Sequence, residues 1–116
     1  MSLENKSADE NYQEACLRWS EIVDLSLDDD KSVLHNATMP LRKALELDPN
    51  HVASLKLLSS ILMENDFYEE AERMLQKLIE LEPEAMEHQQ KLALLESRDR
   101  NQIKDYVESK LLIPGC

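Results

Sequence analysis

Apolar residues along the chain recur at the spacing of an amphipathic helix. Within residues 9–27, for example, Tyr12, Ala15, Trp19 and Ile22 stand three or four positions apart. Residues at this spacing share one face of a helix, so the pattern predicts a helix with a single apolar stripe. Similar spacing predicts further helices over residues 38–48, 51–65, 67–81, 84–97 and 101–113. Since β-branched residues are few, we expect an all-α chain.

One segment of the chain occurs twice. Residues 37–49 read ATMPLRKALELDP, and residues 71–83 read AERMLQKLIELEP, 34 positions later and without a gap. The two copies agree in the placing of their alanine, leucine and proline residues. A fixed period of this size indicates stacked helix–turn–helix units, because one such unit cannot bury its apolar face alone.

The unit between the two copies resembles the tetratricopeptide repeat (TPR) family, whose period is 34 residues. The family's pattern of large, small, alanine and proline positions is met here by Leu55, Leu58, Ser59, Leu62, Ala71, Leu75 and Pro83. Four of these residues differ in identity from the family's usual ones but keep their size class. The small residue lets paired helices approach closely, and the large ones interlock between them. The resemblance implies a right-handed superhelical stack of antiparallel helix pairs, a TPR-like α-solenoid.

We expect a single domain of about three units over residues 1–116. A disordered tail (1–8) precedes a divergent first repeat (9–49), which matches only after a shift of two positions. The best-matching repeat (52–83) follows. The last unit (84–113) has polar residues at several expected core positions. Such departures from the repeat pattern are typical of a terminal capping unit, which has one face exposed to solvent.

Pro40 falls inside the second helical segment of the first repeat. A proline within a helix removes a backbone hydrogen bond. Either the helix is kinked or broken at Pro40, or residues 31–35 form a separate turn and the main helix starts near Thr38. The acidic run that precedes this segment predicts a helix start, with Asp28 or Asp29 as the cap. A calcium loop is not expected, because the required turn glycine and late glutamate are absent.

The chain is acidic, with 24 Asp and Glu against 13 Lys and Arg in 116 residues. Its net charge is −11, of which residues 1–30 contribute −7. This charge disfavours nucleic acid and anionic membranes and favours a basic partner. No signal-type segment and no apolar run of transmembrane length occurs, and the cysteines Cys16 and Cys116 form no framework. We therefore expect a cytoplasmic protein.

Residues that carry chemistry are scarce. A single glycine, Gly115, excludes phosphate-cradling loops. His35, His51 and His88 are isolated from one another, so neither a metal site nor a cofactor is expected. We expect no enzymatic activity, although the sequence leaves open a triad of Ser, His and Asp brought together in space.

The TPR resemblance implies a non-catalytic protein–protein interaction adaptor that binds a peptide or helix in a concave groove. The first helices of successive repeats line such a groove, which here comprises Ser20, Asp24, Ala53, Lys56, Leu57, Ser60, Met63, Gln90, Lys91 and Leu94. The alternative is a structural subunit that forms a homodimer or a fixed part of a larger complex, with Trp19, Phe67 and Tyr68 packing across the interface. The sequence leaves open whether the groove is free or filled by the chain's own C-terminal end.

Cochaperone TPR domains hold a C-terminal carboxylate with lysine, arginine and asparagine side chains. The corresponding positions carry Ser20, Asp24, Leu57, Glu87 and Lys91, of which only Lys91 fits. Two acidic residues there would repel a carboxylate. An Hsp70/Hsp90 carboxylate clamp is therefore not expected.

Overall fold

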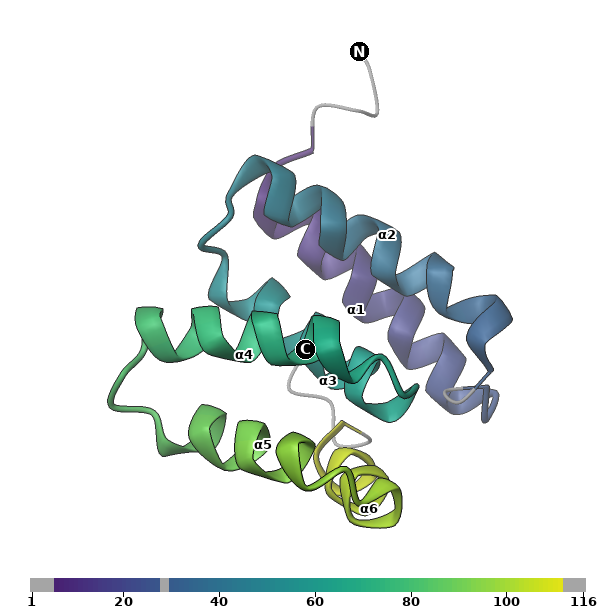
Figure 1. Cartoon of the computed structure of the whole chain (residues 1–116). Coiled ribbons are helices and arrows are strands. Elements are labelled where there is room, and N and C mark those ends of the chain that lie inside the picture. The colour runs from purple at the N-terminus through teal and green to yellow at the C-terminus, as the bar shows by residue number, and fades with distance from the viewer. Residues whose placement is uncertain (1–5, 28–29, 112–116) are drawn as a thin grey trace.

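The computed structural model describes residues 6–27 and 30–111, with side chains described as far as residue 106. Within these residues all regular structure is helical, which confirms the all-α class (Figure 1). The helices are α1 (Ala8–Asp24), α2 (Lys31–Leu47), α3 (Val52–Glu64), α4 (Tyr68–Leu81), α5 (Met86–Ser97) and α6 (Arg100–Leu111). None of the described helices has the length and apolar character needed to cross a membrane.

Side chains that cap the backbone fix where the first helices begin. Ser7 and Glu10 form a reciprocal capping box at α1, each side chain accepting a hydrogen bond from the other's backbone N–H at 3.1 Å. At α2 the cap is Asp30, whose carboxylate accepts from the N–H of Ser32 at 2.9 Å. The acidic run therefore does precede a helix, but the residue that caps it is Asp30, whereas the sequence predicted Asp28 or Asp29. Asp28 and Asp29 lie outside the described residues.

Pro40 lies inside α2 without ending it. The helix runs from Lys31 to Leu47, and Pro40 is buried against the rest of the structure. The alternative of a separate turn over residues 31–35 is therefore wrong, as is a break at Pro40. Burial of the apolar face of α2 offsets the hydrogen bond that a helix-interior proline gives up.

The first four helices form two antiparallel pairs, α1 with α2 and α3 with α4 (Figure 1). The pairs are stacked because α3 packs on α2, and α5 continues the stack by packing on α4. Ser59 and Ala71, the small residues of the repeat pattern, are both fully buried where α3 meets α4. Leu58 and Leu75, two of its large residues, are also fully buried. These four core positions are confirmed.

Helix α3 is the centre of the core. Its residues from Ser54 to Glu64 are buried except for Lys56, so almost every side of the helix is covered. Three neighbours provide the cover: α2, α4 and α6. A helix that is apolar around most of its circumference needs such an interior position.

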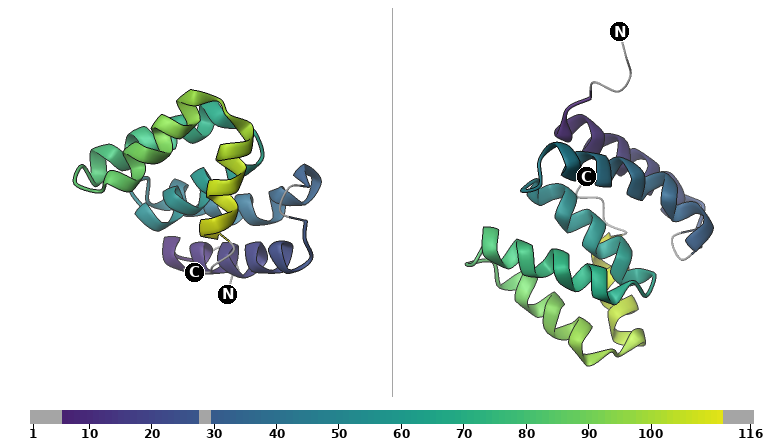
Figure 2. Two further views of the ribbon diagram at one scale, coloured as in Figure 1. Left: turned by 90° about the horizontal axis from the view of Figure 1, so that it is seen from below. Right: turned by 45° about the horizontal axis from the view of Figure 1, so that its top comes forward.

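Helix α6 departs from the stacked arrangement. It runs across the others and contacts α3 far more extensively than its sequence neighbour α5 (Figure 2). The connection after α5 is short, and Arg98 turns the chain with a left-handed backbone (φ 56°). Ile103 of α6 is fully buried in the common core. Helices α5 and α6 therefore do not form an antiparallel pair like α1 with α2 or α3 with α4. Instead, the chain folds back after α5, and α6 packs on α3.

Candidate functional site

The expected groove residues fall on three helices. Ser20 and Asp24 lie on α1; Ala53, Lys56, Leu57, Ser60 and Met63 on α3; and Gln90, Lys91 and Leu94 on α5. These are the first helices of the three units, as the resemblance implies. We call the surface formed by these ten residues the inner face.

Much of the inner face is covered within the chain itself. Leu57, Ser60 and Met63 are 5%, 7% and 0% exposed, and Lys91 is 6% exposed. In contrast, Asp24 and Gln90 are exposed, and the remaining positions are partly so. The middle of the inner face is therefore buried within the structure and does not form an open groove. The sequence left open whether the groove is free or filled by the chain's own C-terminal end, and in the described residues α6 packs on α3, the helix that carries Leu57, Ser60 and Met63. The sequence could not decide this, because it depends on the direction that α6 takes after Arg98.

The two lysines of the inner face are paired with acidic residues of this chain. The Nζ of Lys56 lies 3.6 Å from Glu82 Oε1, and the Nζ of Lys91 lies 3.3 Å from Glu87 Oε1. Burial raises the pKa of Glu87, but the charges of Lys91, Lys56 and His88 outweigh it, and the net effect lowers that pKa. Neither lysine is left uncompensated for a partner's carboxylate.

Helix α6 approaches this charged cluster through Tyr106. Burial raises the pKa of the Tyr106 hydroxyl, and the negative charge of Glu87 raises it further. The last helix thus lies close enough to α5 for their side chains to interact electrostatically, although α6 packs mainly on α3. The inner face between α3 and α5 is consequently a region of internal contacts.

One Asp, one His and one Ser do come together in space. His51 Nε2 lies 2.6 Å from Asp9 Oδ1, and His51 Nδ1 lies 2.7 Å from Ser54 Oγ. The order of groups is that of a hydrolase triad, but Ser54 has no exposed surface, so a substrate has no access to its hydroxyl. His51 also accepts from the N–H of Ser54 as the cap of α3. The arrangement caps α3 and links it to α1.

Metal ligands are not gathered anywhere in the described part of the chain. No group of three or more His, Cys, Asp or Glu residues there is placed to hold a metal ion. His88, for example, is fully buried and uses Nε2 in a 2.7 Å contact with Glu82.

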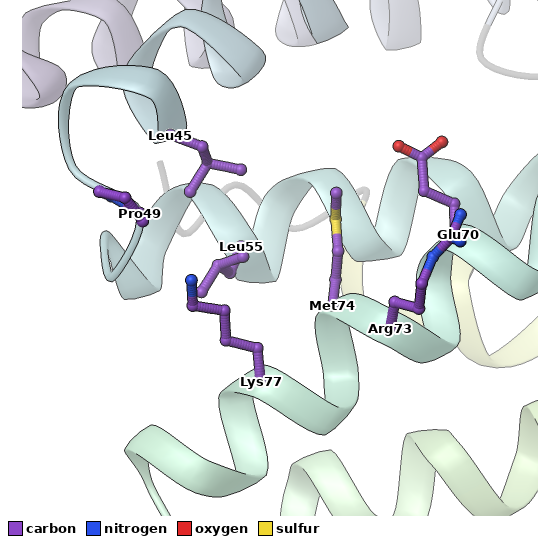
Figure 3. Close-up of a pocket in the computed structure, with 7 residues that line it drawn as sticks. All are labelled: Leu45, Pro49, Leu55, Glu70, Arg73, Met74 and Lys77. Carbon is purple, nitrogen blue, oxygen red and sulfur yellow. The ribbon is translucent and has the colours of Figure 1, made fainter.

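A pocket lies on a different surface, between α2 and α4 (Figure 3). Its volume is about 350 Å³, and its lining residues are Leu45, Pro49, Leu55, Glu70, Arg73, Met74 and Lys77. We call it the α2–α4 pocket. It is separate from the inner face, since none of the ten inner-face residues lines it. The sequence offers little to find it by, because its lining comes from three helices and the Pro49 turn, which only the stacking brings together.

At one rim of this pocket α2 and α4 are tied by an ion pair. Arg42 donates two hydrogen bonds to the carboxylate of Glu70, at 2.5 and 3.2 Å. This bidentate contact holds the pKa of Glu70 below its usual value, and the charge of Arg73 acts in the same direction. Glu70 is thus already neutralised by Arg42.

Comparisons with known proteins found no match to this chain. No family model matches the chain, and the curated proteins and solved structures compared with it show no match either. The TPR resemblance rests on the chain's own 34-residue repeat.

Proposed function

We propose that this chain is a non-catalytic protein–protein interaction adaptor built on a short TPR-like stack. The observation that supports this most is the crossing of α3 by α6. The inner face, where TPR proteins take a peptide or helix, here already has a helix of the chain itself beside it (Figure 2). A surface that packs well against one amphipathic helix is suited to a second one.

The partner meets the inner face at its two uncovered ends. Asp24 and its neighbour Glu21 are exposed on α1, and Gln90 is exposed on α5. Two carboxylates on one turn of a helix attract a basic segment, in keeping with the net charge of −11. Leu57 and Ser60, in the middle of the inner face, are buried and lie outside the surface that this partner contacts.

Site-directed photo-crosslinking tests this proposal. A photoreactive amino acid replaces Asp24 in one variant and Gln90 in another, and each variant is illuminated in an extract of its source cells. A third variant carries the photoreactive group at His35, which is exposed on α2 and forms no part of the inner face. We expect one discrete adduct from both inner-face positions and none from position 35. Adducts from position 35 alone, or from none of the three, would contradict the proposal.

The alternative, a structural subunit in a homodimer or fixed complex, has less support. Trp19, expected at an interface, is 3% exposed and belongs to the core. Tyr68 has the guanidinium of Arg98 5.3 Å above its ring, and Phe67 has the ammonium of Lys31 at 5.5 Å. Among the residues whose side chains are described, the exposed large apolar ones are Leu17, Leu25, Met39, Leu47, Phe67 and Met86. They come from four different parts of the fold, which does not favour one extended apolar interface.

A further inference from the structure

The α2–α4 pocket combines an apolar floor with a charged edge. Leu45 and Pro49 from the end of α2, Leu55 from α3 and Met74 from α4 supply the apolar part. In Figure 3 the side chains of Met74 and Lys77 rise from α4 toward the end of α2. A volume of about 350 Å³ is at the small end of the range for ligand sites, which suits one or two side chains of a peptide.

Two cations at the pocket form no salt bridge with the described acidic side chains, although the charge of Arg73 does act on Glu70. Among the described side chains, Arg73 and Lys77 are in no salt bridge, whereas lysines and arginines elsewhere, such as Lys31 and Arg98, are paired. The absence is notable in a chain with 24 acidic residues. Arg73 and Lys77 stand one turn apart on α4, where like charges repel each other. A carboxylate bound between them relieves that repulsion.

The local charge is opposite to that of the molecule as a whole. Glu70, the acidic residue that lines the pocket, is held by Arg42, so Arg73 and Lys77 dominate the edge. At physiological salt, charges more than about 8 Å away are largely screened, while groups in direct contact are not. An acidic segment can therefore bind here although the net charge is −11.

We propose that the α2–α4 pocket binds an acidic peptide segment that inserts one large apolar side chain. The apolar side chain covers Leu45, Leu55 and Met74, and flanking carboxylates pair with Arg73 and Lys77. The thioether of Met74 is unbranched and adapts its shape to such a side chain. This binding is independent of the proposed function, because the pocket shares no residue with the inner face.

An NMR titration of the isotope-labelled chain tests this proposal. The probe is an unlabelled nine-residue peptide with blocked ends, which has one central phenylalanine flanked by aspartates. We expect saturable shifts of the backbone amides at Leu45, Met74 and Lys77, with little change on α1 and α5. We also expect affinity to fall as salt is raised, since the carboxylate contacts are screened. Replacing the phenylalanine of the probe by alanine is expected to weaken binding at least tenfold.

Matched variants separate the pocket from net charge. Arg73→Glu/Lys77→Glu is expected to weaken binding of the probe at least tenfold. Lys6→Glu/Lys31→Glu changes the net charge equally, at exposed salt bridges away from the pocket, and is expected to retain binding. Met74→Gln leaves the charge unchanged and is expected to weaken binding by removing apolar surface. Circular dichroism checks that each variant is folded.

Three results would overturn the proposal. The first is the absence of saturable shifts at millimolar probe. The second is equal weakening by the pocket and control double variants, which would indicate a response to net charge alone. The third is a doubled solution mass that Arg73→Glu/Lys77→Glu restores to a single chain, which would assign the pocket to a second copy.

Discussion

At the scale of single residues, Glu82 connects more of the fold than its place at a helix end suggests. One of its oxygens lies 2.7 Å from His88 Nε2 and 3.6 Å from Lys56 Nζ, so it joins the end of α4 to α5 and α3. A carboxylate only accepts hydrogen bonds, so Nε2 of His88 is the donor in this contact. The buried Nδ1 of His88 then lacks a hydrogen-bond partner within the described structure.

This contact makes stability depend on pH in the acid range. The hydrogen bond from His88 holds the pKa of Glu82 below its ordinary value, with a smaller contribution from Lys56. A carboxyl whose pKa is lowered by folding stabilises the fold above its unfolded pKa, about 4.3. That stabilisation disappears as pH falls through the folded value. We expect Glu82→Gln to make urea-unfolding stability fall less steeply between neutral and acid pH.

The matched control for this experiment is Glu80→Gln. Glu80 is exposed near the end of α4, two positions before Glu82, and forms no salt bridge with the side chains that the structure describes. Its substitution is expected to leave the pH profile as it is in the parent chain. Identical profiles for Glu82→Gln and the parent would contradict the role given to Glu82.

Residue identities at the repeat positions were enough to predict part of the core. Leu58, Ser59, Ala71 and Leu75 follow from the 34-residue pattern, and all four are fully buried. The burial of Met63 could not be predicted in this way. The repeat pattern places Met63 in the groove that would bind a ligand. Whether its side chain is exposed there depends on contacts between helices that are distant in sequence.

At the scale of elements, α6 is the helix whose place the sequence did not reveal. Its existence over residues 101–113 was predicted from the apolar spacing, and the structure has it at Arg100–Leu111. Its direction depends on the left-handed turn at Arg98 and the short connection from Ser97 to Arg100. Neither signal is strong in sequence, because a left-handed turn is usually marked by glycine or asparagine.

Ile103 is expected to anchor α6 to α3. Replacing Ile103 by Ala removes fully buried apolar atoms, a change that typically costs about 2–5 kcal/mol. Since α6 forms few contacts with α5, we expect the loss to appear first as local opening of α6. Hydrogen–deuterium exchange is expected to show faster exchange over α6 with α1 and α2 unchanged. A uniform acceleration over all helices would contradict a separable α6.

At the scale of the whole molecule, the two surfaces that we propose as binding sites differ in the sign of their charge. Asp24 of the inner face and its neighbour Glu21 are exposed, whereas at the α2–α4 pocket Arg73 and Lys77 form no salt bridge with any described residue. The net charge of −11 led us to expect an acidic binding surface such as the end of the inner face. It gave no sign of the basic edge of the α2–α4 pocket. Local charge depends on which residues the stacking of α2 and α4 brings together.

The central claim is that the chain acts as a single copy that binds other proteins, and its solution mass tests this most directly. Light scattering is measured over a concentration series, at low and at raised salt. We expect a mass near 13.4 kDa throughout, because the exposed large apolar residues of the described structure lie in or next to four different helices. A doubled mass that does not change with concentration would contradict the claim and make self-assembly the main role of this fold.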